Sequence, residues 1–136
     1  MRYKLKSLIL AVVALVSCSG HETVDVLIVG GGASGISAGV QSARMGTNTM
    51  IVEETPWVGG MLTSAGVSCV DGNYNLRGGI FGEFADSLAA RYGGWEALKT
   101  GWVSHINFEP HVGQEVLTNI AEACGNDLRI SRETVV

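Results

Sequence analysis

Two short apolar runs, 26–29 and 49–52, flank a segment of helical periodicity in the first half of the chain. Both runs are continuous rather than alternating, which is typical of parallel strands buried on both faces. Gly46 follows the helical segment as the residue that ends it. The order strand, helix, strand therefore predicts an α/β fold with a parallel sheet. The small and apolar positions that predict the helix are Ile36, Gly39, Val40 and Ala43.

The second half of the chain carries two more helical stripes. One covers residues 80–92, and the other begins at Pro110 and is expected to end at Gly125. A short amphipathic turn is expected over 95–102, and a third parallel strand over 128–136. The inward positions of the second stripe are Val112, Val116, Leu117, Ile120 and Ala121.

The turn between the first strand and the first helix holds glycine at three positions, each for its own reason. Gly30 permits a tight turn, Gly32 allows a diphosphate to approach the backbone, and Gly35 lets the helix pack on the strand. The free N–H groups and positive dipole end of a helix that begins here favour an anion. Glu53 ends the second strand, where a carboxylate can accept hydrogen bonds from ribose hydroxyls. This pattern predicts a dinucleotide cofactor.

Residues 53–84 resemble the N-terminal part of FAD-dependent oxidoreductases of the glutathione-reductase-like superfold. The motifs that carry the resemblance are Glu53-Glu-Thr-Pro-Trp-Val-Gly-Gly-Met, Asp71-Gly-Asn and Gly79-Ile-Phe-Gly-Glu-Phe. The resemblance extends over about residues 25–136, in particular to bacterial flavoproteins that are secreted or lipid-anchored. It implies FAD as the cofactor and identifies no substrate.

The resemblance also implies roles for further residues. Gly59 and Gly60 would let the chain turn beside the diphosphate and the flavin ribityl, and backbone groups of Val135 or Val136 would contact adenine. A tight turn packed on its own domain is the alternative explanation of the two adjacent glycines, but the glycine turn and Glu53 upstream favour the cofactor role. The candidate cofactor-binding residues are Gly30, Gly31, Gly32, Ala33, Ser34, Gly35, Glu53, Glu54, Gly59, Gly60, Met61 and Val136.

The first seventeen residues have the features of a signal peptide. A basic start is followed by the apolar run 8–16, which is too short to span a bilayer. The run ends in Leu-Val-Ser before Cys18, which resembles the lipobox of bacterial lipoproteins and implies lipidation of that cysteine. A plain signal sequence cleaved before Gly20 or His21 is the alternative. We thus expect an exported, membrane-anchored lipoprotein, periplasmic or at the cell surface.

The expected organisation is a signal peptide over 1–17, a linker over 18–24 and a nucleotide-binding domain over 25–136. Beyond residue 17 the chain has six basic and thirteen acidic residues, a net charge of −7. Because no basic cluster or aromatic platform appears there, we expect no nucleic-acid partner. Cys69 and Cys124 lack Cys-x-x-Cys spacing and are expected as small buried hydrophobes, with a covalent flavin link or redox pair as a minor alternative.

Three residues invite a catalytic role without establishing one. Arg77 could face a flavin or an anionic substrate, although a solvated loop arginine is the commoner case. His105 and His111 could move protons, but no acid or cysteine stands at metal-ligand spacing from them, so no metal site is expected. The catalytic residues and the oligomeric state therefore stay open.

The sequence as a whole predicts a Rossmann-like FAD/NAD(P)-binding domain with a parallel sheet, in which the flavin accepts a hydride from a small organic substrate. Its motifs account for the adenosine and diphosphate half of the cofactor. No second flavin-contacting segment or substrate domain is recognised, so an N-terminal fragment, inactive alone, is expected. The alternatives are a non-catalytic lipid-anchored nucleotide-binding stub and an NAD(P)-dependent dehydrogenase.

Overall fold

The computed structural model describes residues 22–72 and 74–136 and contains one parallel sheet. Its strands are β1 (Val26–Val29), β2 (Thr49–Val52) and β3 (Leu128–Ser131), in the order β1-β2-β3. All neighbouring strands run parallel, with Ile51 of β2 opposite Ile130 of β3. The predicted α/β fold with a parallel sheet is confirmed.

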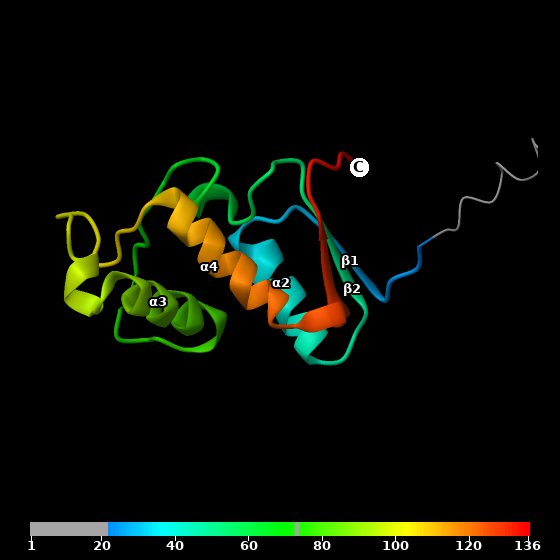
Figure 1. Cartoon of the computed structure of the whole chain (residues 1–136), viewed down its shortest axis with the longest axis horizontal. Helices are drawn as coiled ribbons and strands as arrows, with labels where there is room; N and C mark the ends of the chain where they lie inside the picture. The colour runs from blue at the N-terminus through cyan, green and yellow to red at the C-terminus, as the bar shows by residue number, and fades with distance from the viewer. Residues whose placement is uncertain (1–21, 73) are drawn as a thin grey trace, which may run out of the picture.

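Three α-helices pack on one side of this sheet (Figure 1). They are α2 (Ala33–Arg44), α3 (Gly79–Tyr92) and α4 (Pro110–Glu122). Helix α2 contacts all three strands, α4 lies against α2, and α3 packs on α4 at a greater distance from the sheet. Three short 3-10 helices complete the described elements: η1 (Gly60–Leu62), η2 (Trp95–Leu98) and η3 (Gly125–Asp127).

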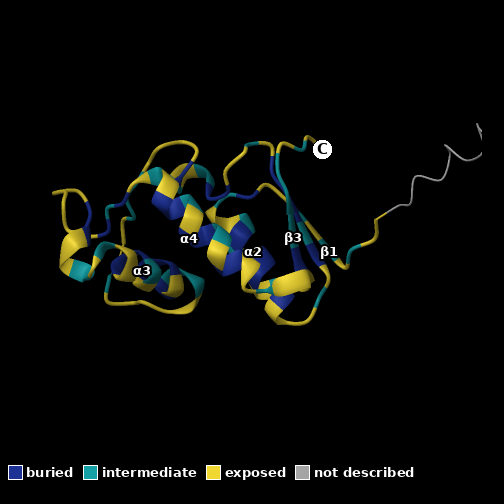
Figure 2. Ribbon diagram, in the orientation of Figure 1, coloured by how far each residue is buried: buried dark blue, intermediate teal, exposed yellow. Residues whose placement is uncertain are grey.

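The core extends from the sheet through α2 and α4 to α3 and η2, and Figure 2 shows buried positions along these helices. The stripe predicted for α2 is buried, and so are the five inward positions predicted for α4. A Cβ at Gly39 would lie 2.5 Å from Ile51 Cδ1, so the absent side chain lets α2 approach the sheet closely. Gly46 has a φ of +85° and ends α2 as predicted, with its N–H donating to the Ala43 carbonyl.

The prediction that β1 is buried on both faces is wrong. Leu27 is 53% exposed and Val29 is 67% exposed, whereas Ile28 between them packs against the core. The cause is that α2 covers one face of the sheet, and no described residue buries the other side of β1. A continuous apolar run is therefore half-exposed in this structure.

Several predicted boundaries and burials are also corrected. The third strand ends at Ser131 rather than 136, because the chain turns at Glu133, which has a φ of +56°. Helix α4 ends at Glu122, before Gly125, and continues through a turn into η3. Cys69 and Cys124 are free thiols and half-buried, so the prediction that both are buried is wrong.

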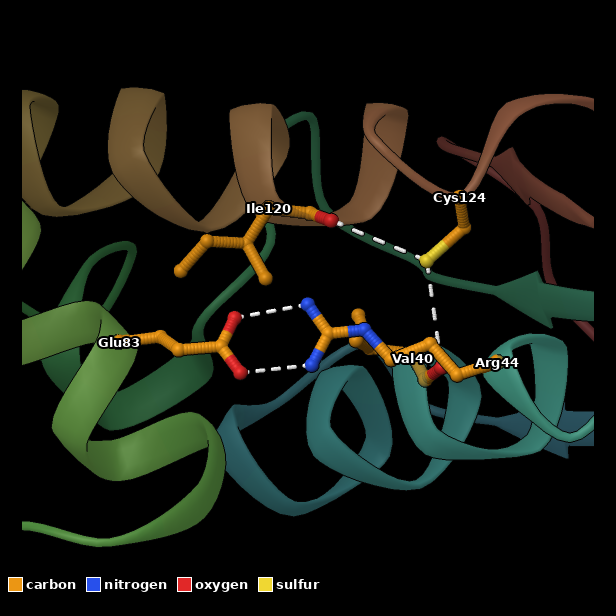
Figure 3. A network of polar contacts seen from close by, with 5 residues as sticks. All are labelled: Val40, Arg44, Glu83, Ile120 and Cys124. Atoms are coloured by element: carbon orange, nitrogen blue, oxygen red, sulfur yellow. Dashed lines mark hydrogen bonds and ion pairs between the residues drawn. The ribbon is translucent and has the colours of Figure 1, made fainter.

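A polar network joins the three helices near the C-terminal ends of α2 and α4 (Figure 3). Arg44 donates two hydrogen bonds of 2.7 Å to the Glu83 carboxylate, which lowers the pKa of Glu83 and raises that of Arg44. The Cys124 sulfur lies 3.9 Å from the Val40 carbonyl oxygen. Since the ion pair is more than one third exposed, we expect it to orient α3 on α2 more than to stabilise the fold.

The described helices also bear on how the chain could meet a membrane. Within residues 22–72 and 74–136, none has the length and apolar character needed to cross a bilayer. The predicted signal peptide and Cys18 lie outside the described residues.

The burial of one leucine and the exposure of another predict that alanine substitutions at the two positions will differ strongly in their effect on stability. Leu88 is fully buried in the core, whereas Leu76 is 72% exposed. We expect Leu88→Ala to lower the free energy of unfolding by about 2–5 kcal/mol, because it leaves a cavity. Leu76→Ala should change it by no more than about 0.5 kcal/mol. Urea denaturation of the full chain, followed by circular dichroism, measures both, and equal losses would contradict the packing described.

Candidate functional site

The turn from β1 to α2 depends on glycine at both of its ends. Gly30 has a φ of +95°, and its N–H donates to the Val52 carbonyl across an N···O distance of 2.8 Å. A Cβ at Gly35 would lie 1.9 Å from the Gly30 carbonyl oxygen, a distance that no side chain can occupy. The tight turn and the close helix packing expected from the sequence are thus present.

Gly32 between them differs, because none of the described residues would clash with a side chain at this position. Its φ is −63°, and among the described residues no atom lies within 4 Å of where its Cβ would be. A side chain here would project into open space beside the start of α2. That space is where the sequence places the diphosphate.

The N-terminus of α2 leaves its first backbone N–H groups available. Gly32 is the N-cap, no side chain of the described residues caps the helix, and its first turn contains no acidic residue. Ala33 and Ser34 are exposed in this first turn. Unpaired N–H groups and a positive dipole end suit an anion. These residues therefore fit a diphosphate group.

The Glu53 carboxylate ties the end of β2 to this turn. Glu53 is 8% exposed. Its carboxylate accepts hydrogen bonds from the Gly31 N–H at 2.5 Å, the Thr55 N–H at 2.9 Å and the Thr55 hydroxyl at 2.7 Å. Burial works to raise the pKa of Glu53, but the hydrogen bonds from Thr55 and Gly31 outweigh it and hold that pKa below its usual value. Glu53 is therefore an ionised part of the turn.

This arrangement refines the predicted role of Glu53. A carboxylate offers about four acceptor positions, and three are occupied within the protein, which leaves room for one hydroxyl of a ligand. A Cβ at Gly31 would lie 3.0 Å from the Glu53 carboxylate, so Gly31 makes the contact possible.

The role of Thr55 was not predicted from the sequence. The only available signal was a hydroxyl residue two positions after the acid, which is typical of a local hydrogen bond.

The second glycine turn lies against the first. Gly59 has a φ of +109° and Gly60 a φ of +55°. The Gly59 N–H donates to the Gly31 carbonyl across 2.8 Å, and a Cβ on Gly60 would lie 3.1 Å from the Gly32 Cα. A Cβ on Gly59 would also meet Leu117 at 2.8 Å, so internal packing explains part of this pair. Met61 follows with its side chain exposed.

A cavity of about 230 Å³ opens at the carboxyl ends of β1 and β2. This edge of a parallel sheet is where α/β proteins place ligands. The Thr134 N–H donates to the Glu53 carbonyl, which brings the last residues of the chain to this edge. The cavity is lined by Val29, Gly30, Val52, Glu53, Glu54, Thr134, Val135 and Val136.

The remaining candidates lie elsewhere. His105 stacks on Tyr74, and His111 is exposed at the start of α4. Within the described ranges no group of three or more His, Cys, Asp and Glu side chains could hold a metal ion. Catalytic residues are not assigned by this geometry.

The buried position of Glu53 predicts a pH-dependent stability. Because its folded pKa is lowered, its contribution is present above the usual glutamate value of 4.5 and is lost as the pH falls through the folded pKa. We expect Glu53→Gln to reduce the free energy of unfolding by about 1.5–3 kcal/mol at pH 7. The difference from wild type should shrink in acid. Glu54→Gln, at the exposed neighbour, is the control and should matter much less. A difference that stays constant from neutral to strongly acidic pH would contradict this account.

Comparison with known proteins places these features in a family. Residues 25–136 match the family described as FAD dependent oxidoreductase. The alpha subunit of sarcosine oxidase from Corynebacterium sp. is 38% identical over 52 residues, covering 38% of this chain and 5% of that protein. Fumarate reductase (cytochrome) from Shewanella frigidimarina is 36% identical over 47 residues, covering 35% of this chain and 8% of that protein. The chain thus spans less than one tenth of the length of these relatives.

A solved structure shows a weaker likeness. The crystal structure of Thermovibrio ammonificans THI4 aligns with 94% of this chain and 45% of that chain, at 18% identity and a TM-score of 0.44. A score this low does not by itself establish a common fold. The family match extends over most of the chain, and it includes both glycine turns and Glu53. The chain belongs to the FAD dependent oxidoreductase family, and FAD is the cofactor of that family.

Proposed function

We propose that this chain binds the adenosine and diphosphate half of FAD at the edge of its sheet, as part of an enzyme that oxidises a small organic substrate. The observation that carries the proposal is the open space at Gly32, beside an uncapped helix start. The space leaves room for a ligand group directly at the start of α2, and the same turn is held beside the Glu53 carboxylate at the edge of the sheet.

Each part of the site has a partner of suitable chemistry in the cofactor. The N–H groups around Gly32, Ala33 and Ser34 would hold the diphosphate, since no side chain of the described residues caps this helix start and its first turn contains no acidic residue. The remaining acceptor position of the Glu53 carboxylate would accept a hydrogen bond from one ribose hydroxyl. Glu54 and Val136 line the cavity that would receive the adenosine. Gly60 and Met61 would lie beside the ribityl part.

The bound flavin would supply the redox chemistry, accepting a hydride from the substrate. The residues of this chain would bind and orient the cofactor, and none of the described side chains is assigned to proton transfer. Because the chain spans only a small share of its relatives, the substrate and the complete reaction stay open.

We also propose that the protein is exported and anchored to a membrane through Cys18. The proposal rests on the basic start, the short apolar run and the small residue before this cysteine. The net charge of −7 beyond residue 17 suits a partner other than nucleic acid.

The open space at Gly32 allows a test in which the fold is kept and only the ligand is excluded. We expect Gly32→Val in the full-length protein to lose FAD, because the valine would occupy the space of the diphosphate. Gly78→Val is the matched control, since Gly78 is also a helix N-cap at negative φ with open space around its missing Cβ. Both substitutions should cost similar, small amounts of stability. Flavin absorbance after gel filtration and FAD titration measure the effect.

Three outcomes of this comparison would contradict the proposal. The first is stoichiometric flavin in the Gly32→Val protein. The second is an equal loss of flavin in both variants. The third is wild-type protein that binds NAD⁺ in place of FAD, which would assign the site to a nicotinamide cofactor.

The anchoring proposal is tested separately with Cys18→Ala. We expect this variant to accumulate as an unprocessed precursor or to be released from the membrane fraction, since the acceptor of the lipid is missing. Wild-type protein should partition into detergent and carry added mass at its mature N-terminus, as measured by phase separation and mass spectrometry. Identical partitioning of both proteins, with no added mass, would rule out lipidation at this residue.

A further inference from the structure

A second cavity, of about 350 Å³, lies away from the sheet, between the chain that leads into α3 and the segment that contains η2. Figure 1 shows η2 and the loop after it at the end of the molecule opposite the sheet. The size is within the range of small-molecule sites. It brings together Arg77 and His105, whose roles the sequence left open. The cavity is lined by Tyr74, Asn75, Arg77, Trp95, Lys99, His105 and Ile106.

The charge of this cavity is opposite to that of the protein. Two of the six basic residues beyond residue 17, Arg77 and Lys99, line it, and no carboxylate is among the described residues that do. Arg77 pairs with Asp86 at 3.7 Å, beyond hydrogen-bond distance, and Lys99 pairs with Glu96 at 2.6 Å. Both carboxylates are mostly in solvent, with exposures of 65% and 85%. Such exposed pairs are weak, so an anion in the cavity can compete for the two cations.

The guanidinium of Arg77 is held in a defined orientation. Its Cζ lies 4.1 Å from the centroid of the Trp95 ring, a cation–π contact. This contact restricts the rotation of a long side chain, and a planar acceptor can replace the exposed Asp86 carboxylate beside its N–H groups. A guanidinium group can donate two parallel hydrogen bonds to the two oxygens of a carboxylate.

Part of the cavity lining is aromatic. The rings of Tyr74 and His105 are stacked with centroids 4.6 Å apart and planes 8° from parallel. Ile106 beside them is fully buried and gives this part of the lining an apolar support. Parallel rings next to a cationic group suit a flat ligand with one charged end, because such ligands stack on ring faces.

We propose that this cavity binds the carboxylate of a small aromatic acid. The carboxylate lies against Arg77 and Lys99, and the ring of the ligand packs on the pair formed by Tyr74 and His105. The proposal does not rest on flavin binding, since the residues of the cavity are separate from those of the glycine turns.

The test uses calorimetric titration of the full-length protein with benzoate as the probe. We expect benzoate to bind, and benzamide, which has the same ring without the charge, to bind at least about tenfold more weakly. Arg77→Gln should weaken benzoate binding by a similar factor. Arg91→Gln is the control, because Arg91 is an exposed α3 arginine that pairs with Glu115 outside this cavity. It should bind benzoate as wild type does.

The Gly32→Val protein separates this proposal from the flavin site, because it should bind benzoate normally even if it has lost FAD. Three results would overturn the proposal: no binding of benzoate, equal binding of benzoate and benzamide, or unchanged binding by Arg77→Gln. Equal losses in Arg77→Gln and Arg91→Gln would also overturn it, since they would reflect general charge and not this cavity.

Discussion

The contact between the Glu53 carboxylate and the Gly31 N–H is the interaction on which the rest of the site depends. It joins the end of β2 to the turn that follows β1, so the acid that ends one strand fixes the path of the glycine loop beside it. Thr55 supplies two further hydrogen bonds that keep this carboxylate ionised while it is buried. A buried charge is tolerated only when it is satisfied in this way.

Close backbone approach is the second constraint, and it explains why the glycines lie where they do. The Gly35 position faces the Gly30 carbonyl at a distance that excludes any side chain, and Gly39 brings α2 onto Ile51. Gly32 has no such neighbour among the described residues. The same short segment thus contains glycines required by the fold and one available for a ligand, and only the structure separates the two kinds.

Much of this architecture could be predicted from the sequence because its signals are local. Helical periodicity located α2, α3 and α4, and glycine after a periodic segment marked the end of α2. The half-exposed face of β1 could not be predicted, since burial depends on which elements cover the sheet and not on the strand's own residues. The hydrogen bond from Gly31 to Glu53 and the proximity of Arg77 to His105 could not be predicted either, because each joins segments that are distant in sequence.

The most direct measurement is a titration of the isotope-labelled full-length protein with FAD, followed through the backbone amide resonances. The account predicts that the largest shifts occur at Gly31, Gly32, Ala33 and Ser34, with smaller shifts at Glu53, Glu54 and Val136 around the cavity. The amide resonances of α3 should not shift. Resonances of the glycine turn that remain unchanged at saturating FAD, or shifts confined to other parts of the chain, would contradict the account.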